Sequence, residues 1–404
     1  MDLSSYDVEA LRAHFPALES GIAHFDGPGG TQTPRVVAQA VADTLMGPLS
    51  NRGTGIVSES NADDAVHAFR SAYADLLGVP ATGIVHGRSA TALIYDFSRA
   101  LAKTWGPDDE IVVSRLDHDA NVRPWVQAAE SAGASVRWLD IVPETAELDL
   151  ESAASVIGPR TRVVALTAAS NLLGTMPPVR ALADLVHAVG GLMFVDGVHY
   201  TAHHPVDLAE LGADLFVCSP YKCLGPHLGV LAASPDLLET IENDKLLPAT
   251  NAVPERFELG TLPYEAMAGA TAAVDFLAAI APGNAKSRRD RLASSLAATD
   301  AHEHGLSARL EAGLESLPGV EVRSRAARRT PTVFFTVGER DPWVAYEFLC
   351  ARNVLVGAGE FYAYEPATRL GIMPAGGLRL GMAPYTTESE VDRALEGLAE
   401  FLRS

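Results

Sequence analysis

The chain has 404 residues, 48% apolar and 20% charged, a composition typical of a soluble globular enzyme large enough for two lobes. Its 31 basic and 51 acidic residues give a formal net charge of −20, which argues against nucleic-acid or anionic-membrane partners. The three cysteines (Cys218, Cys223, Cys350) are too few for a disulfide framework and lack metal-ligand spacing, so a reducing cytoplasm is expected.

The amino-terminal residues 1–9 lack the basic start and apolar core of a signal peptide. No stretch of the sequence approaches the roughly 20 uninterrupted apolar residues that cross a bilayer. We therefore expect a cytoplasmic protein that has no membrane partner.

Between about residues 60 and 235, amphipathic helical patterns alternate with short apolar runs. Helices are expected at 62–77, 90–104, 122–132 and 179–189, and strands at 83–86, 110–113, 135–138, 162–166, 192–195 and 215–218. This alternation predicts an α/β fold whose mostly parallel sheet is covered by helices on both faces. Ligands of such sheets bind beyond the carboxyl ends of the strands.

The composition changes around residues 281–285. Beyond this point the pattern predicts helices at 287–315, 343–352 and 388–401, and strands at 320–323, 332–337 and 378–382. We therefore predict a large domain of residues 20–280 and a small α+β domain formed by residues 1–19 and 281–404.

Lys222 lies between Tyr221 and Cys223, just beyond the apolar run that ends at Cys218. Burial in such a place makes an amine easier to deprotonate than a free lysine, whose pKa is about 10.4. A neutral amine can form a Schiff base with an aldehyde cofactor. A lysine that snorkels from a strand end is the alternative, and the motifs around Lys222 favour the cofactor.

Three more polar side chains follow predicted strands. Asp196 ends a strand 26 residues before the lysine, where a carboxylate can keep a pyridinium nitrogen protonated or simply cap a turn. His118 follows the strand at 110–113 and can stack on a flat ring or shuttle protons, unless it is a hydrogen-bonded surface group. His199 can hydrogen-bond a ring hydroxyl.

Residues 87–91 join a predicted strand to a predicted helix, and the free N–H groups of such a junction suit a phosphate. The side chains of Arg88 and Ser89 would add contacts there, although an ordinary helix cap has the same pattern. Ser219 supplies another hydroxyl close to the lysine. Arg379, among strand-forming residues of the small domain, suits either a substrate carboxylate or a structural salt bridge.

Six motifs follow one another between residues 24 and 387. They are Asp117-His-Asp-Ala-Asn121, Ser170-Asn-Leu-Leu-Gly-Thr175, Val195-Asp-Gly197, His203-His-Pro-Val-Asp207, Ser219-Pro-Tyr-Lys-Cys-Leu-Gly-Pro226 and Arg256-Phe-Glu-Leu-Gly-Thr261. Together they resemble the class V aminotransferase family of pyridoxal-phosphate enzymes, specifically its cysteine desulfurase and selenocysteine lyase group. The resemblance implies a fold-type I homodimer that acts on a small amino-acid substrate at active sites shared between subunits.

The resemblance also implies a role for each candidate residue. Lys222 would hold the aldehyde of pyridoxal 5′-phosphate, and Asp196 would pair with its pyridine nitrogen. His118 would stack over the ring, and His199 takes the place of a residue that contacts the phenolic oxygen. The residues expected at the phosphate are Arg88, Ser89, Ser219, Tyr221 and, from the partner subunit, Thr261. Asn171, beside the cofactor, and Arg379 correspond to contacts with the substrate carboxylate.

The largest departure from this group is in the loop at 356–366. Members that abstract sulfur carry a nucleophilic cysteine in this loop, whereas this chain has Tyr362 at the corresponding place and no cysteine within the loop. Cys350 lies in an apolar run and is expected in the core, and Cys223 is expected to pack away from the lysine. A desulfurase that transfers a persulfide is therefore not expected, and Tyr362 becomes a candidate substrate contact.

Removal of the substrate α-proton by Lys222 leaves three outcomes open. Loss of a sulfur-bearing β-substituent gives a C–S lyase, which is our leading hypothesis. Reprotonation from the opposite face, with Tyr362 as a second acid/base, gives an epimerase similar to isopenicillin N epimerase, and reprotonation on the cofactor gives an aminotransferase. A non-catalytic protein that binds the cofactor is the alternative from a different class.

Overall fold

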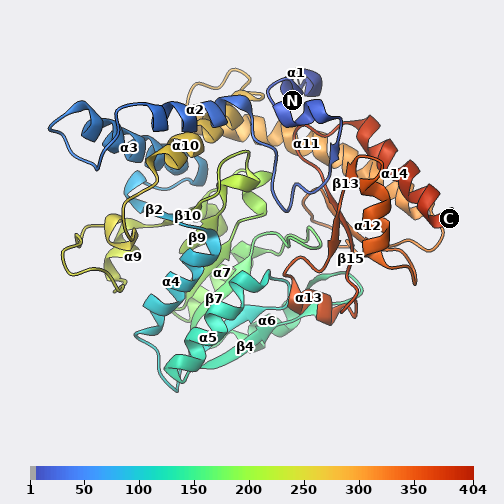
Figure 1. Ribbon diagram of the computed structural model, residues 1–404. Helices are drawn as coiled ribbons and strands as arrows, with labels where there is room; N and C mark the ends of the chain where they lie inside the picture. Colours follow the sequence, from blue (N-terminus) through green and yellow to red (C-terminus); the bar gives the residue numbers. More distant parts are fainter. Residues whose placement is uncertain (1–5) are drawn as a thin grey trace.

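The computed structural model describes residues 6–404, so residues 1–5, which begin the segment expected at 1–19, lie outside the described part. A seven-stranded sheet lies in the middle of the large domain, with helices on both sides (Figure 1). In spatial order its strands are β2 (Ile84–Gly87), β10 (Gly229–Ala233), β9 (Leu215–Cys218), β8 (Leu192–Asp196), β7 (Thr161–Thr167), β3 (Glu110–Ser114) and β4 (Ser135–Leu139). All neighbours pair in parallel except β10, which is antiparallel to both β2 and β9. The predicted α/β fold with a mostly parallel sheet is confirmed.

Strand β10 was missed by the sequence pattern. Its sequence Gly-Val-Leu-Ala-Ala is completely buried, but glycine and alanine are poor strand formers and give no alternation. Because β10 pairs with β2 on one side and with β9 on the other, it forms a strand despite the weak strand preference of its residues. The other six strands of the sheet lie within two residues of their predicted positions.

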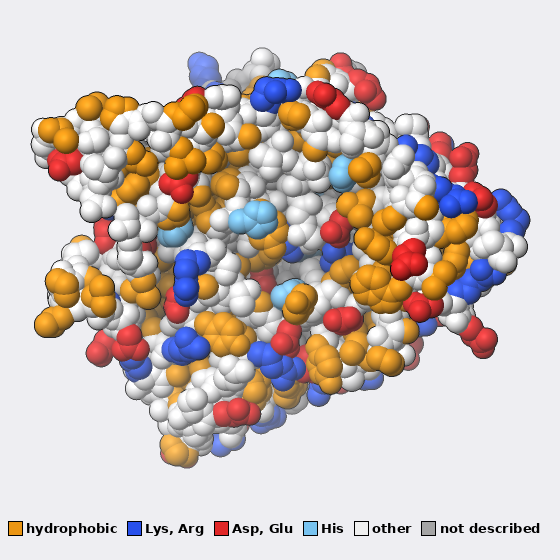
Figure 2. All heavy atoms as spheres, in the orientation of Figure 1, with side chains coloured by type: hydrophobic (Ala, Val, Ile, Leu, Met, Phe, Trp, Pro, Cys, Tyr) orange, Lys and Arg blue, Asp and Glu red, His pale blue; other side chains and the backbone are white. Residues whose placement is uncertain are grey.

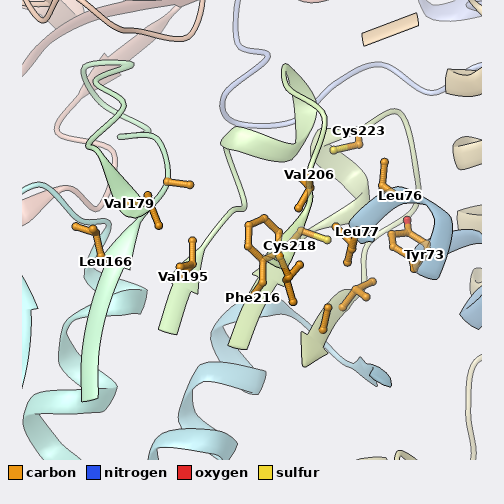
Figure 3. Packing of buried hydrophobic residues seen from close by; sticks show 14 of the residues in the cluster. Tyr73, Leu76, Leu77, Leu166, Val179, Val195, Val206, Phe216, Cys218 and Cys223 are labelled. Carbon is orange, nitrogen blue, oxygen red and sulfur yellow. The ribbon is translucent and has the colours of Figure 1, made fainter. Parts of the chain in front are cut away.

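The helices on the two faces of the sheet pack against alternate residues of the strands. One face is covered by α3 (Val57–Leu77), α7 (Val179–Ala188) and α10 (Tyr264–Ala279), and the other by α4 (Ala90–Ala102) and α5 (Arg123–Ala132). Figure 3 shows Val195, Phe216 and Cys218 of β8 and β9 on the first face, with Tyr73 and Leu77 of α3 nearby. Because both faces are buried, the carboxyl ends of the strands are the part of the sheet left open to a ligand.

The small domain is built on a four-stranded sheet in the order β11 (Glu321–Val322), β12 (Thr332–Thr336), β15 (Gly377–Gly381) and β14 (Gly357–Gly359). Its helices are α11 (Arg288–Glu315), α12 (Pro342–Cys350), α13 (Tyr364–Arg369) and α14 (Glu388–Arg403). The amino-terminal segment packs here, since Arg12 of α1 (Val8–Arg12) pairs with Glu390 at 3.0 Å. These contacts agree with an assignment of residues 6–19 to this domain, while the boundaries themselves stay a prediction.

The remaining elements are short or lie at the edges. They are β1 (Ala23–His24), α2 (Arg35–Met46), β5 (Ile141–Val142), β6 (Glu147–Leu148), α6 (Leu150–Val156), α8 (Leu208–Leu211), α9 (Pro235–Thr240) and β13 (Val354–Leu355). Strand β1 pairs in parallel with β13 of the small domain, which ties the two lobes together. Within residues 6–404, every helix is too short or too polar to traverse a bilayer.

Candidate active site

A cavity of about 90 Å³ lies beyond the carboxyl ends of the central strands. Eight of the residues singled out from the sequence line it: Ser89, His118, Asn171, Asp196, His199, Ser219, Tyr221 and Lys222. They follow β2, β3, β7, β8 and β9, so parallel pairing brings residues far apart in the sequence to one edge of the sheet.

Lys222 ends the short turn Pro220–Lys222 that follows β9, and only 8% of it is exposed. Burial lowers the pKa of its amine to about 8, and the nearby Arg379 cation acts in the same direction. Roughly a tenth of such an amine is neutral at pH 7, against less than about one part in a thousand for an ordinary lysine. The lysine is therefore prepared to attack an aldehyde and to accept a proton.

Asp196 is the last residue of β8 and is 5% exposed. Its Oδ1 accepts a hydrogen bond of 2.8 Å from the Val198 N–H, and burial raises its pKa to about 6. The next residue, Gly197, has no room for a side chain, because a Cβ atom there would lie 1.8 Å from Cζ of Phe216. The result is a carboxylate that is largely ionised at neutral pH, yet basic enough to keep a hydrogen-bonded pyridinium protonated.

His118 is held in its turn by a buried carboxylate. Asp117 accepts hydrogen bonds from Ser114 and, at 2.7 Å, from Asn121 Nδ2, and burial raises its pKa to about 8. Nδ1 of His118 accepts from the Ala120 N–H at 3.0 Å, so the proton of the neutral ring is on Nε2. Burial, with Lys222 and Arg379 nearby, lowers the pKa of His118 to about 4. A flat, uncharged imidazole thus faces the cavity.

His199 is anchored by the small domain. Its Nε2 lies 2.9 Å from the hydroxyls of both Thr330 and Thr332, and burial lowers its pKa well below the usual value. Only Nδ1 is left for a bound molecule. The two threonines were missed by the sequence analysis, because they lie more than 130 residues away along the chain and belong to the other lobe.

The hydroxyls proposed for a phosphate lie at the amino end of α4 and after β9. Ser89 caps α4 and accepts from the Ala92 N–H at 3.1 Å, which leaves its own proton free to donate. Ser219 is 3% exposed and lines the same cavity. Arg88 and Thr261 are exposed and do not line it, so the structure does not bring these two predicted residues into the site of this chain.

Arg379 of β15 is 2% exposed and already has several partners. Its Nη1 donates to the Asn171 carbonyl at 2.9 Å, its Nη2 donates to Asp26 Oδ1 at 3.0 Å, and its guanidinium carbon lies 3.8 Å from the centre of the Phe361 ring. Among residues 6–404, the buried Arg379 Nε and Asn171 Oδ1 atoms have no hydrogen-bond partner. Asp26 was not predicted in this role, because 353 residues separate it from the arginine.

A wider cavity of about 830 Å³ opens next to the first and shares His118, Asn171, Tyr221 and Lys222 with it. Figure 2 shows the hollow in this face of the molecule. Tyr362 lines the wide cavity, is 75% exposed, and its ring stacks at 5.7 Å and 28° on His118. Phe361 and Tyr362 both have a φ of 58°, a left-handed conformation that non-glycine residues keep only where surrounding contacts impose it.

None of the three cysteines lines either cavity. Cys218 and Cys223 are buried, as expected for Cys223, among the apolar side chains of Figure 3. Burial raises the pKa of Cys223 to about 12, which makes its thiol a poor nucleophile. The expectation of a core position for Cys350 was wrong, because this residue ends α12 and is only partly buried.

The cavity residues fit pyridoxal 5′-phosphate. Lys222 suits its aldehyde, Asp196 its ring nitrogen and the face of His118 its ring, while the hydroxyls at the amino end of α4 suit its phosphate. Asn171, whose buried Oδ1 has no partner among the described residues, also lines this cavity, so a bound group could satisfy that atom.

The class V aminotransferase family model matches residues 23–394. An uncharacterised protein of Mycobacterium tuberculosis is 31% identical over 397 residues, covering 98% of this chain and 99% of the relative. The aminotransferase-like protein FGM3 of Gibberella zeae is 30% identical over 413 residues, with 98% and 99% covered. The solved structure of the cysteine desulfurase CsdA of Escherichia coli is similar with a TM-score of 0.87 at 25% identity, covering 98% of this chain and 99% of that one. This chain therefore belongs to the class V aminotransferase family and is one of its pyridoxal-phosphate-dependent enzymes.

Proposed function

We propose that this enzyme is a C–S lyase similar to the cysteine desulfurases, which eliminates a sulfur-bearing β-substituent from an amino acid without passing sulfur to a cysteine of its own. The observation that carries this proposal is the pairing of a buried, readily deprotonated Lys222 with cavity walls that contain no cysteine. Elimination needs a base and a leaving group, but no nucleophilic thiol.

The proposed steps use residues of the cavity. Arg379 and Asn171 orient the substrate carboxylate, which places the Cα–H bond near the Lys222 amine, and Lys222 removes the α-proton. When bound, the cofactor accepts the electron pair that this proton leaves behind. Asp196 keeps the proton on the ring nitrogen, which that electron sink requires. The same lysine, now protonated, lies where it can return the proton to the departing sulfur.

The other predicted residues receive supporting roles in this proposal. His118 would cover the cofactor ring, His199 would be available to the phenolic oxygen through Nδ1, and hydroxyls with N–H groups would hold the phosphate. The residues assigned to the phosphate are Ser89, Ser219 and Tyr221, with Thr261 serving the site of a second subunit, while Arg88 lies outside the cavity and receives no role. The exposed position of Thr261 is compatible with that last assignment.

A homodimer in the cytoplasm is part of the same proposal. Exposed aliphatic side chains lie at the end of α2 and the start of α3, and again on the chain segment that follows α9: Leu45, Met46, Ile56, Val57, Leu246, Leu247 and Leu259. We call them the aliphatic patch; apolar side chains are visible in Figure 2 over the region of α2 and α3. A second copy of the chain would cover the patch. Three free cysteines fit a reducing compartment.

The test is incubation of the purified holoenzyme with L-cysteine and S-substituted L-cysteines in deuterated water. We expect pyruvate together with sulfide or the corresponding thiol. An epimerase is the second candidate, because the Tyr362 phenol lies beside the cavity that also holds Lys222. A D-amino acid deuterated at the α-carbon, formed without pyruvate or thiol, would establish the epimerase and exclude the lyase.

A further inference from the structure

The cavity beside Lys222 is much larger than a small amino acid requires. Its volume of about 830 Å³ falls in the range of roughly 300–1,000 Å³ that encloses ligands of drug size. A bound cofactor would share this space, and the cofactor with an unsubstituted substrate such as cysteine would still leave part of it to water. The size of the cavity therefore indicates a substrate whose side chain fills it.

Aromatic residues form the rim of this cavity. Besides Tyr221 and Phe361, four aromatic residues line it: Tyr95 of α4, Trp343 and Tyr346 of α12, and Tyr362 of the loop before α13. The charged Asp119, Arg123 and Glu360 line the same cavity. Trp343 is 52% exposed and Tyr362 is 75% exposed. Exposed aromatic rings at the mouth of a cavity offer flat apolar surface on which an aromatic ligand can stack.

The rim is organised by stacked and edge-on contacts. The rings of Trp343 and Tyr346 lie 5.8 Å apart at 73°, and the ring of Tyr362 stacks on His118 at 5.7 Å. Trp343 also approaches the loop, where a Cβ atom on Gly359 would lie 3.5 Å from its Cζ2. These contacts fix the rings at the mouth of the cavity while leaving much of their surface free for another flat group.

The rim is distinct from the aliphatic patch. In Figure 1, α12 lies on the right of the molecule, whereas α2 and α3 lie on the left. The patch consists of aliphatic residues, as expected where a second copy packs, whereas the rim is aromatic and continuous with the cavity that holds Lys222. The rim is therefore placed to contact a substrate that is bound beside Lys222.

We propose that the substrate is an amino acid with a bulky aromatic side chain, such as an S-arylmethyl conjugate of cysteine, whose ring stacks between Trp343 and Tyr362. This inference rests on the proposed function for the bond that breaks. The size of the side chain is inferred from the volume of the cavity and its aromatic character from the rings of the rim, and both hold for elimination and for epimerisation alike.

Binding can be measured separately from turnover. The probes are α-methyl-S-benzyl-L-cysteine and α-methyl-S-methyl-L-cysteine, which have no α-proton to lose, and calorimetry on the holoenzyme gives their dissociation constants. We expect the benzyl compound to bind at least about 10-fold more tightly than the methyl compound. We expect Trp343→Ala to weaken binding of the benzyl compound about 10-fold and to change the affinity for the methyl compound by no more than about twofold. Trp343→Phe should restore most of the lost affinity for the benzyl compound.

Val344→Ala is the matched control. Val344 follows Trp343 on α12 and is 53% exposed, but it does not line the cavity, so its variant should bind both probes like the parent enzyme. Equal affinity of the parent enzyme for the two probes would overturn the inference. If Trp343→Ala weakened the binding of both probes equally, or if Val344→Ala lost as much affinity for the benzyl probe, the inference would also be overturned. A retained benzyl preference without thiol or pyruvate in turnover assays would instead refute only the proposed elimination.

Discussion

Two walls bound the adjoining narrow and wide cavities, and they differ in burial and in the way they are held. The inner wall, formed by Asp196, His199, Ser219 and Lys222, comes from the strand ends of the large domain, and each of these residues is 8% exposed or less. The outer wall is the loop of residues 359–365 from the small domain, of which Glu360, Phe361 and the largely exposed Tyr362 line the wide cavity. The inner wall therefore acts through charges whose pKa values are shifted by burial, while the outer wall acts through its shape and its position.

The outer wall is held by a few polar contacts with the segment that carries His118 and with Asn171. Glu365 is buried and pairs with Arg115 at 2.9 Å and with Arg123. The Tyr362 carbonyl accepts from the Asp119 N–H at 2.7 Å, and the Phe361 carbonyl accepts from Asn171 Nδ2 at 2.9 Å. Loss of one such contact should change the fit of the loop without changing the charges of the inner wall.

Lys222→Ala should have the largest effect, because it removes the proposed base of the inner wall. We expect kcat to fall on the order of 1,000-fold or more. Borohydride treatment should attach the cofactor covalently to the parent enzyme but not to the variant. Lys286→Ala changes an exposed lysine and serves as the control. Covalent attachment that persists in the Lys222 variant would show that another residue holds the cofactor.

Glu365→Gln should have a smaller effect, because it loosens the outer wall only. The loss of one charge leaves Arg115 and Arg123 without their common carboxylate, so we expect KM to rise about 10-fold and kcat to fall less. The cofactor absorbance should stay as in the parent enzyme. Glu347→Gln, on the exposed side of α12, is the matched control. A large loss of bound cofactor in the Glu365 variant would contradict the separation of the two walls.

Arg379 offers a test of the electrostatics of the inner wall. Burial and the Arg379 cation together hold the pKa of Lys222 at about 8, below its usual 10.5. Arg379→Gln should therefore raise this pKa, leave less neutral amine at pH 7 and slow uptake of the cofactor by the apoenzyme about threefold. Uptake by the parent apoenzyme should rise with pH and level off above about pH 8. A variant whose pH profile coincides with that of the parent would contradict this assignment.

The same pKa predicts how stability depends on pH. Between about pH 8 and 10.5 the unfolded chain binds one more proton at Lys222 than the folded chain does, so this residue makes the free energy of unfolding rise with pH across that window. Urea denaturation of the apoenzyme on either side of pH 8 measures the slope, and Lys222→Met should remove this contribution.

The inner wall was largely predictable from the sequence, whereas the outer wall was not. Asp196 and Lys222 follow apolar runs, and a polar residue directly after an apolar run can be recognised in the sequence alone. The pairing of Asp26 with Arg379, the two threonines on His199 and the arginines on Glu365 are contacts between the lobes, over 130 to 353 residues. No local pattern encodes such contacts, because they depend on how the lobes pack.

Tyr362→Phe should have the smallest effect and separates shape from chemistry at the outer wall. The phenylalanine ring keeps the stacking on His118 and loses only the hydroxyl of a side chain that is 75% exposed. If the loop acts through its shape, turnover by elimination should stay within about twofold, whereas Tyr362→Ala, which also removes the ring, should weaken substrate binding several-fold. The two variants should be compared in the pyruvate assay and by calorimetry with the benzyl probe. A large drop in turnover for Tyr362→Phe with unchanged binding would mean that the hydroxyl takes part in proton transfer, and the outer wall would then contribute chemistry as well as fit.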